Sequence, residues 1–294
     1  MNSNFAPTPA SLTHQHLFAC INTLIPSDAR SIRILDAGCG DGKLISFIHK
    51  SLQLQHPDLS FEIYGFDVVD HGVQTSGFLD GTITLLSSDI TNVNWPERIK
   101  PLHMGDTWDF PDNFFDVILS NQVFEHVHDK LFFFKESYRV MRDGGHAIHL
   151  APLVHYIYEG HLYLPLVHRI RSHDMLYSYI SFLSLVGFGK FRNHNKLTGI
   201  SRSDFSIKHA DYVYFWTNYS SESEMLDMAR ASQFRASFRF SLDFYLLKLR
   251  QIFRFPYKAS YNPSRSALLD SIAIKFLRYL SSTTFVCEKR NTYK

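Results

Sequence analysis

The chain has 294 residues, of which 45% are hydrophobic and 20% are charged. This amount of apolar material can form a large core, which excludes a disordered chain, a small disulfide-stabilised protein and a fibrous repeat. The net charge is only +2, but residues 1–150 carry 10 basic and 18 acidic residues, whereas residues 230–294 carry 13 basic and 3 acidic residues. An acidic first half and a basic final segment indicate two different tasks along the chain.

From residue 31 to about residue 152, short β-branched or aromatic runs alternate with longer segments of helical periodicity. This rhythm predicts strands at 32–35, 61–66, 99–104, 115–119 and 146–150, and helices at 43–54 and 130–141. We expect the fifth strand to be entered through Gly144 and Gly145. Repeats of this kind predict an α/β fold with a doubly wound parallel sheet, which binds ligands at the carboxyl ends of its strands.

Beyond residue 152 the chain becomes aromatic and rich in histidine, and this segment at 153–219 is interpreted as an acceptor-side insertion. Ser221 followed by Glu224 is a capping-box pattern, which predicts a helix that ends near residue 233.

Two late strands are expected at 234–240 and 283–288. Between them, residues 241–282 form a long helical insertion that carries most of the positive charge of the final segment. We therefore expect residues 1–294 to form a single domain, with its ligand-binding core at 31–152.

Cysteine usage and hydropathy indicate the compartment. The three cysteines, Cys20, Cys39 and Cys287, are odd in number and far apart, and no basic residue precedes an apolar run at the amino terminus. These features predict a protein of the reducing cytoplasm. The longest uncharged apolar stretches, at 144–158 and 175–189, are shorter than the roughly 20 residues that cross a bilayer, so no transmembrane helix is expected.

Three glycines, Gly38, Gly40 and Gly42, follow the first predicted strand and open the first helix. Glycines let the backbone turn tightly, adopt positive φ and approach a ligand closely. A dinucleotide-binding loop has a further glycine three positions after the second, which this loop lacks. Asp36 and Asp41 would repel a pyrophosphate, so this loop suits a ligand with a cationic amino group.

This loop resembles the nucleotide-binding loop of class I S-adenosylmethionine-dependent methyltransferases, which has the pattern Asp-x-Gly-x-Gly-x-Gly. Asp67 ends the second predicted strand, where an acidic side chain can accept the hydroxyls of a ribose. Residues 110–118 match the family's Pro-x-x-x-x-Phe-Asp-Val entry to the fourth strand, residues 120–127 its exit, and residues 139–145 the helix end before the fifth strand. The resemblance covers residues 31–152 in order and spacing.

The resemblance implies the Rossmann-like seven-stranded sheet of class I methyltransferases, here with helical and aromatic insertions, and S-adenosyl-L-methionine as the cofactor. Asp106, rather than Asp89, is expected to accept the adenine amino group, because Asp89 is too far from the fourth strand. The sequence departs from the family in the long segment 68–98, between the second and third predicted strands. The residues expected to bind the cofactor are Asp36, Gly38, Cys39, Gly40, Asp67, Val68, Asp106, Thr107, Asn121 and Gln122.

The segment that follows the fifth strand, at 152–168, resembles that of bacterial methyltransferases associated with surface-polysaccharide and sugar modification. This resemblance implies a small or glycan-like acceptor with a hydroxyl group, which benefits from a general base because its pKa is high. His155, Glu159 and His161 are the catalytic candidates. The alternative is an aromatic lid whose histidines only bond to the backbone.

His126, after the fourth strand, is a further catalytic candidate at the junction of donor and acceptor. It is either a hydrogen-bonding group or general base, or a histidine that holds its loop in shape. No metal is expected, because neither the spacing of His126 and His128 nor that of the candidates after the fifth strand matches an established zinc pattern.

The sequence thus predicts a methyltransferase that acts on oxygen. The alternatives are an enzyme that methylates nitrogen or carbon of a lipophilic metabolite, and a non-catalytic S-adenosylmethionine-binding protein. The basic residues of 230–294 are interpreted as a solvated helix face or as a weak contact with an anionic membrane surface, and the apolar stripe at 244–253 is expected to be core. Nucleic acid is not an expected partner, because no recognition motif is present. The oligomeric state is not predicted.

Overall fold

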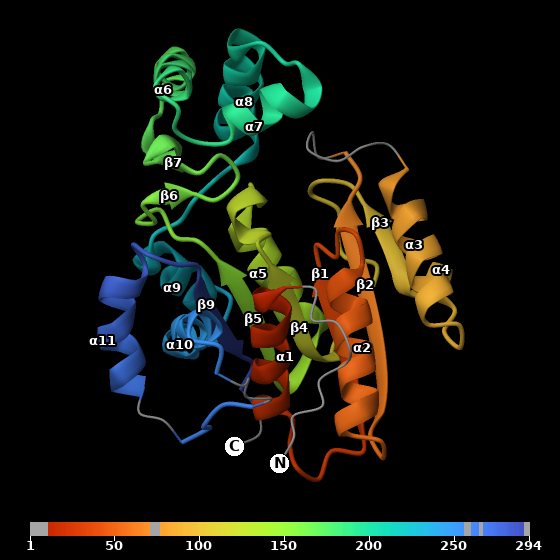
Figure 1. Ribbon diagram of the computed structural model, residues 1–294. Helices are drawn as coiled ribbons and strands as arrows, with labels where there is room; N and C mark the ends of the chain where they lie inside the picture. Colours follow the sequence, from red (N-terminus) through yellow and green to blue (C-terminus); the bar gives the residue numbers. More distant parts are fainter. Residues whose placement is uncertain (1–10, 71–76, 256–259, 265–266, 291–294) are drawn as a thin grey trace.

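A seven-stranded sheet forms the centre of the computed structural model, which describes residues 11–70, 77–255, 260–264 and 267–290 (Figure 1). The strand order is β3-β2-β1-β4-β5-β9-β8. The strands are β1 Ser31–Ala37, β2 Ser60–Val68, β3 Ile99–Leu102, β4 Phe115–Asn121, β5 Met141–Ala151, β8 Arg235–Ser237 and β9 Thr283–Glu288. Strands β1 to β5 are parallel, and β9 is antiparallel to both of its neighbours. The winding reverses between β1 and β4, which confirms the doubly wound, Rossmann-like fold.

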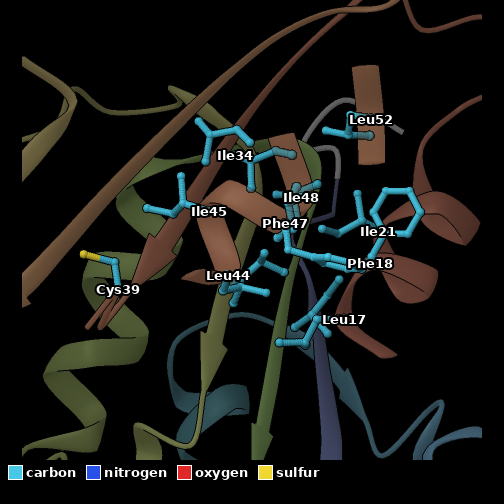
Figure 2. Packing of buried hydrophobic residues seen from close by; sticks show 14 of the residues in the cluster. Leu17, Phe18, Ile21, Ile34, Cys39, Leu44, Ile45, Phe47, Ile48 and Leu52 are labelled. Carbon is cyan, nitrogen blue, oxygen red and sulfur yellow. The ribbon is translucent and has the colours of Figure 1, made fainter. Parts of the chain in front are cut away.

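Helices cover both faces of the sheet. One face is covered by α1 Leu12–Leu24, α2 Lys43–Gln55, α3 Phe78–Asp89 and α10 Ser241–Ile252, and the other by α5 Lys130–Val140 and α9 Glu222–Ala231. Helix α11 Ala267–Leu277 packs against α10 and contributes Ile274 to the core of the second face. The short helix α4 Trp95–Arg98 precedes β3. Neighbouring strand residues such as Ile34 and Leu35 belong to different core clusters, because successive side chains of a strand point to opposite faces. Figure 2 shows Leu17 and Phe18 of α1 packed with Phe47 of α2 on the first face.

The strands and helices predicted over residues 31–152 are confirmed, with one correction at the fifth strand. Strand β5 begins at Met141, so Gly144 and Gly145 lie inside the strand rather than before it. The register jumps between Phe115 and Val117 of β4, which places the extra residues of β5 in a bulge. Gly144 has φ of +79°, a conformation that glycine adopts easily and that suits a bulge.

Other predictions need correction near the carboxyl end. The strand expected at 234–240 is only three residues long, and Phe240 with φ of +69° starts the next helix instead. The stripe at 244–253 is only partly core: Phe244 is buried, whereas Ile252 and Phe253 are exposed. Helix α1 was not predicted from the sequence at all.

The segment at 153–219 forms a small unit with its own apolar core beyond the carboxyl ends of β4 and β5 (Figure 1, green to teal). Its elements are the hairpin strands β6 Tyr158–Glu159 and β7 Leu164–Pro165, the turn η2 Val167–Arg169, and the helices α6 His173–Leu185, α7 Phe191–Thr198 and α8 Arg202–Trp216. Helices α6 and α8 pack against each other and provide most of this core. No helix in the described part of the chain combines the length and apolar character needed to cross a membrane.

Candidate active site

The glycine loop connects β1 to α2 next to the exit of β4. Gly38, Gly40 and Gly42 all have positive φ, at +85°, +51° and +75°. A Cβ at Gly38 would lie 2.5 Å from the side chain of Val123, so only glycine fits there. A Cβ at Gly40 would meet no heavy atom within 4 Å, so the loop backbone is open to a ligand at this point.

Hydrogen bonds to β2 hold this loop in place. The N–H of Cys39 donates to the carbonyl of Phe66 over 2.9 Å, and the N–H of Gly40 donates to Oδ2 of Asp67 over 2.7 Å. The buried Cys39 side chain packs over Gly65, where a Cβ would lie only 3.0 Å from it. Cys39 therefore uses both its N–H and its side chain to fix the loop.

Asp36 is a buried carboxyl at the end of β1, and neither of its oxygens has a hydrogen-bond partner among the described residues. Burial raises the pKa of Asp36 well above its usual range, and the nearby Asp67 and Asp41 raise it further. A positively charged ligand at this position would favour the ionised form. The site thus fits the cationic amino-acid part of S-adenosylmethionine.

Asp67 is the penultimate residue of β2, one residue before the observed end of the strand, and it is buried. Its Oδ1 accepts the N–H of Val68 over 2.8 Å, while its Oδ2 accepts the N–H of Gly40. An acidic side chain at this end of the second strand is placed to accept the hydroxyls of a ribose. The same residue can therefore anchor the loop and bind the nucleoside.

The predicted adenine contact lies in a different kind of environment. Asp106 and Thr107 are exposed in a turn after β3, and Oδ2 of Asp106 accepts the N–H of His103 over 3.2 Å. Its rival Asp89 ends α3 and binds Ser46 and Lys50 of α2. The role of Asp106 toward adenine stays a prediction.

The exit of β4 is strained and polar. Asn121 ends the strand, and Gln122 has φ of +57°, an uncommon conformation for a residue other than glycine that tends to occur at functional sites. The N–H of Gln122 donates to the carbonyl of Leu150 over 2.8 Å. Asn121 donates to the hydroxyl of Thr13 over 3.2 Å, while its buried Oδ1 has no partner among the described residues.

Helix α1 brings two residues to this site that the sequence did not reveal. Thr13 meets the end of β4, and His14 lies close enough to Asp41 of the glycine loop for their charges to interact. Burial lowers the pKa of His14, which keeps it neutral. The sequence feature that could have predicted helix α1 is Ser11, a residue type that often caps helices and that precedes the apolar residues at 17–21.

On the acceptor side, three segments distant in sequence bring aromatic and titratable rings together. The turn η1 Phe124–His126 places the ring of His126 with its centroid 5.3 Å from that of His161, which in turn lies 5.1 Å from that of Tyr212 in α8. Nδ1 of His126 donates to the carbonyl of Trp216 over 2.8 Å. Its Nε2 therefore carries the lone pair in the neutral form, 3.4 Å from the hydroxyl of Tyr212.

Glu159 is fully buried and accepts three hydrogen bonds, from Nδ1 of His161 at 2.6 Å, the N–H of Leu162 at 2.7 Å and the hydroxyl of Tyr219 at 2.9 Å. Burial alone would raise the pKa of Glu159, but these bonds outweigh it and hold the pKa below its usual value. Burial alone would lower the pKa of His161, but Glu159 outweighs it and raises that pKa. Glu159 is therefore ionised around neutral pH, and His161 becomes a neutral base only at a higher pH than an unperturbed imidazole.

A second polar centre lies beside this cluster and was not predicted from the sequence. Glu125 is fully buried without a partner for either carboxyl oxygen among the described residues, and burial raises its pKa to about 7. Lys130 donates to the carbonyls of Val127 and Asn218, and burial lowers its pKa to about 8. Both side chains line a cavity of about 10 Å³, which has room for about one water molecule.

His155 lies apart from the other catalytic candidates. Its ring centroid is 5.8 Å from that of Tyr279, which follows α11. Burial and the positive charge of Arg278 lower its pKa. The structure thus groups His126, Glu159 and His161 but places His155 in a different environment. In the described residues, no three His, Cys, Asp or Glu side chains are arranged to hold a metal ion.

The doubly wound sheet, the glycine loop at its switch point and the acidic residues that end β1 and β2 together define a class I methyltransferase fold and site. Residues 11–198 match the family model described as a methyltransferase domain. The chain belongs to this family of methyltransferases, and the buried Asp36 beside the glycine loop fits S-adenosyl-L-methionine as the cofactor.

Solved structures similar to the chain include methyltransferases with different acceptors. Phosphoethanolamine N-methyltransferase 2 from Haemonchus contortus, in complex with S-adenosyl-L-methionine, is 13% identical with a TM-score of 0.48, and the match covers 98% of this chain and 55% of that one. An S-adenosylmethionine-dependent methyltransferase from Mesorhizobium loti is 12% identical with a TM-score of 0.47, over 90% and 94% of the two chains. Geranyl diphosphate C-methyltransferase from Streptomyces coelicolor A3(2) is 12% identical with a TM-score of 0.44, over 94% and 78%. The chain thus spans about half the length of the Haemonchus enzyme, and no curated protein matches its sequence.

Proposed function

We propose that this methyltransferase transfers the methyl group to a hydroxyl oxygen of a small or glycan-like acceptor, with His161 as the general base. The observation that carries the proposal is the pairing of a fully buried Glu159 with His161, whose side chain is 40% exposed. A carboxylate bound to Nδ1 leaves Nε2 to accept a proton and stabilises the resulting imidazolium. A hydroxyl gains most from such a base because its own pKa is high.

The other grouped residues have supporting roles in this proposal. Glu159 is a positioning residue rather than a base, because it is buried and its oxygens are already bonded to three donors. His126 presents Nε2 beside the same ring cluster and is the second candidate to contact the acceptor. Tyr212 packs against both histidines and limits their rotation.

The cofactor supplies a methyl group that is already activated by its positively charged sulfur. The chain therefore needs to align the two reactants and exclude water. Asp36 and Asp67 would hold the donor, and His161 would take the proton of the acceptor hydroxyl, whose oxygen would accept the methyl group while the donor sulfur keeps the electron pair of the carbon–sulfur bond. The products are a methyl ether, S-adenosylhomocysteine and a proton on the imidazole.

The surroundings of the ring cluster suit a small-molecule acceptor. Tyr158 of β6 and Tyr163, between β6 and β7, are exposed on the hairpin that carries His161. Nζ of Lys190 lies 4.2 Å from the ring centroid of Tyr163. Aromatic faces combined with a few polar groups are typical of small-molecule sites. The proposal places the reaction in the cytoplasm, where the buried free thiols of Cys20 and Cys287 remain reduced.

The experiment that tests the proposal uses S-adenosylmethionine with a labelled methyl group and a cytoplasmic metabolite extract, followed by identification of the labelled atom. The label should appear on oxygen. His161→Ala should lower turnover on the order of a hundredfold while affinity for S-adenosylhomocysteine stays unchanged. His155→Ala is the matched control, because this histidine of the same segment lies outside the cluster, and it should retain activity.

Three outcomes would contradict the proposal. Label on nitrogen or carbon would favour the alternative acceptors, and no labelled product despite tight binding of S-adenosylhomocysteine would favour a non-catalytic binding protein. Loss of activity in His155→Ala but not in His161→Ala would identify His155 as the general base.

A further inference from the structure

Helix α11 is apolar on opposite sides although it lies on the outside of the molecule (Figure 1, dark blue). Ile274 and Leu277 are buried, and Ile274 belongs to the apolar core on one face of the sheet. The outward side carries four large apolar residues whose spacing places them on one side of a helix. These four, here called the α11 face, are Leu268 (66% exposed), Leu269 (51%), Ile272 (49%) and Phe276 (70%). Neighbouring exposed apolar side chains of this size mark an interaction surface.

The neighbouring helix adds exposed apolar residues close in sequence to this face. Helix α10 packs against α11, and at its carboxyl end Ile252 is 71% exposed and Phe253 67% exposed. Phe255 follows and is also exposed. The exposed apolar residues of the final segment are therefore concentrated in this pair of helices.

The charge around the α11 face decides what kind of partner fits. Lys275 is exposed between Ile272 and Phe276, and Arg254 follows α10. Within the part of the chain that the structure describes, neither cation forms an ion pair. Residues 230–294 hold 13 basic and only 3 acidic residues. Apolar side chains flanked by cations are typical of surfaces that rest on anionic lipid headgroups.

We propose that the α11 face docks on an anionic membrane surface, with Leu268, Ile272 and Phe276 in the headgroup region and Lys275 among the lipid phosphates. A second copy of this chain fits less well, because a symmetric contact would bring two strongly basic segments together. Docking would leave the catalytic cluster free, since that cluster is built from η1, β6 and α8.

The chain provides its own matched control. Helix α6 also exposes large apolar residues, among them Phe182 (60% exposed) and Leu185 (61%). However, residues 151–229 contain 7 basic and 7 acidic residues, so this helix lacks the positive excess of the final segment. If exposed apolar area alone caused membrane binding, α6 would bind as well as α11.

The test is flotation of the full chain with vesicles of phosphatidylcholine alone or of an equimolar mixture of phosphatidylcholine and phosphatidylglycerol. The chain should float only with the anionic vesicles at low salt and should be released as salt rises. The double variant Ile272→Glu, Phe276→Glu should lower vesicle affinity at least about tenfold, and Lys275→Glu should lower it about fivefold. The α6 variant Phe182→Glu, Leu185→Glu should bind like the unchanged chain.

Thermal unfolding and binding of S-adenosylhomocysteine show whether each variant is folded, and the single substitution Lys275→Glu covers the case in which the double variant does not fold. The proposal is overturned if the chain floats with neither type of vesicle, or floats equally with both. It is also overturned if the α6 variant loses binding while the α11 variants keep it. A third result would also overturn it. If the chain binds no vesicles but forms a concentration-dependent dimer, and the α11 variants are monomeric, the α11 face binds a second copy of the chain.

Discussion

Nδ1 of His161 and Oε1 of Glu159 are joined by a 2.6 Å hydrogen bond between an exposed imidazole and a fully buried carboxylate. The carboxylate is held in turn by the N–H of Leu162 and the hydroxyl of Tyr219, so its orientation is fixed from the interior. A buried charge with three donors can set both the direction and the protonation of the histidine bound to it. This relationship leads to a prediction about pH.

Glu159→Gln should move the acidic limb of the pH–activity profile to lower pH and lower the maximal rate. Glu159 raises the pKa of His161 above its usual value, so the neutral base forms only as pH rises through that raised pKa. Without the negative charge, burial lowers the pKa of His161, and the base form is present at lower pH. The measurement is kcat/KM against pH with the acceptor found by labelling.

Asp211→Asn is the control for this profile, because Asp211 bonds His173 over 2.7 Å at a surface site outside the cluster. Its profile should match that of the unchanged enzyme. An unmoved limb in Glu159→Gln would mean that His161 is not the group that titrates.

Asp67→Ala should weaken binding of S-adenosylhomocysteine by roughly 1–3 kcal/mol, because charge-assisted hydrogen bonds to the ribose are lost. The substitution also removes the acceptor for the N–H of Gly40, which loosens the glycine loop. Calorimetry measures the affinity. Asp89→Ala is the control, since Asp89 binds Ser46 and Lys50 on a helix surface, and its variant should bind the ligand normally.

Gly65→Ala should destabilise the fold by about 1–3 kcal/mol and lower donor affinity as well. The new Cβ would lie 2.9 Å from Cδ1 of Ile45 and 3.0 Å from Cβ of Cys39, so it would push the glycine loop away from β2. Gly81→Ala in α3 is the matched control, because its Cβ would meet nothing within 4 Å and alanine favours a helix by about 0.5–1 kcal/mol. Urea unfolding of both variants measures the two effects. Equal stability of both variants would contradict the close contact between Gly65 and the glycine loop.

The donor half of the fold was predictable because its signals are local. Each strand of the core is a short apolar run, and the glycine loop and Asp67 occur at the ends of such runs. The structure confirms these elements and brings Asp67 to Gly40 with a direct hydrogen bond. Helix α1 was not predicted from the sequence because it precedes the first strand and has no charged residue to mark a polar face.

The acceptor half was only partly predictable, because its contacts join segments far apart in the sequence. His126, Glu159 and His161 could be chosen one by one as proton-transfer groups, but the sequence could not tell that His155 lies elsewhere. Helix α6 was missed because its 13 residues have little polar periodicity: Leu176 and Ile180 are buried, while other apolar side chains of the helix are exposed. Helical periodicity is visible only when one face is polar.

Glu125→Gln should make the protein more stable relative to the unchanged chain as pH rises from about 4.5 to 8. Burial raises the pKa of Glu125 to about 7 in the folded state, against a usual value of 4.5. Between these values the folded state binds more protons than the unfolded state, so this group lowers the free energy of unfolding as pH rises. The shift corresponds to roughly 3 kcal/mol, which glutamine removes because it does not ionise. Urea unfolding at pH 4.5 and pH 8 measures this difference, since the titration of other groups cancels between the two proteins.

Glu224→Gln is the control with the opposite sign. Hydrogen bonds from the N–H and hydroxyl of Ser221 lower the pKa of Glu224, so its stabilising effect is present above its usual pKa and is lost as pH falls. Glu224→Gln should therefore lose more stability at pH 8 than at acidic pH, whereas Glu125→Gln gains. If Glu125→Gln and the unchanged chain differ by the same free energy at both pH values, Glu125 is not a protonated acid near neutrality. In that case a water molecule or ion in the cavity beside Lys130 must satisfy its charge.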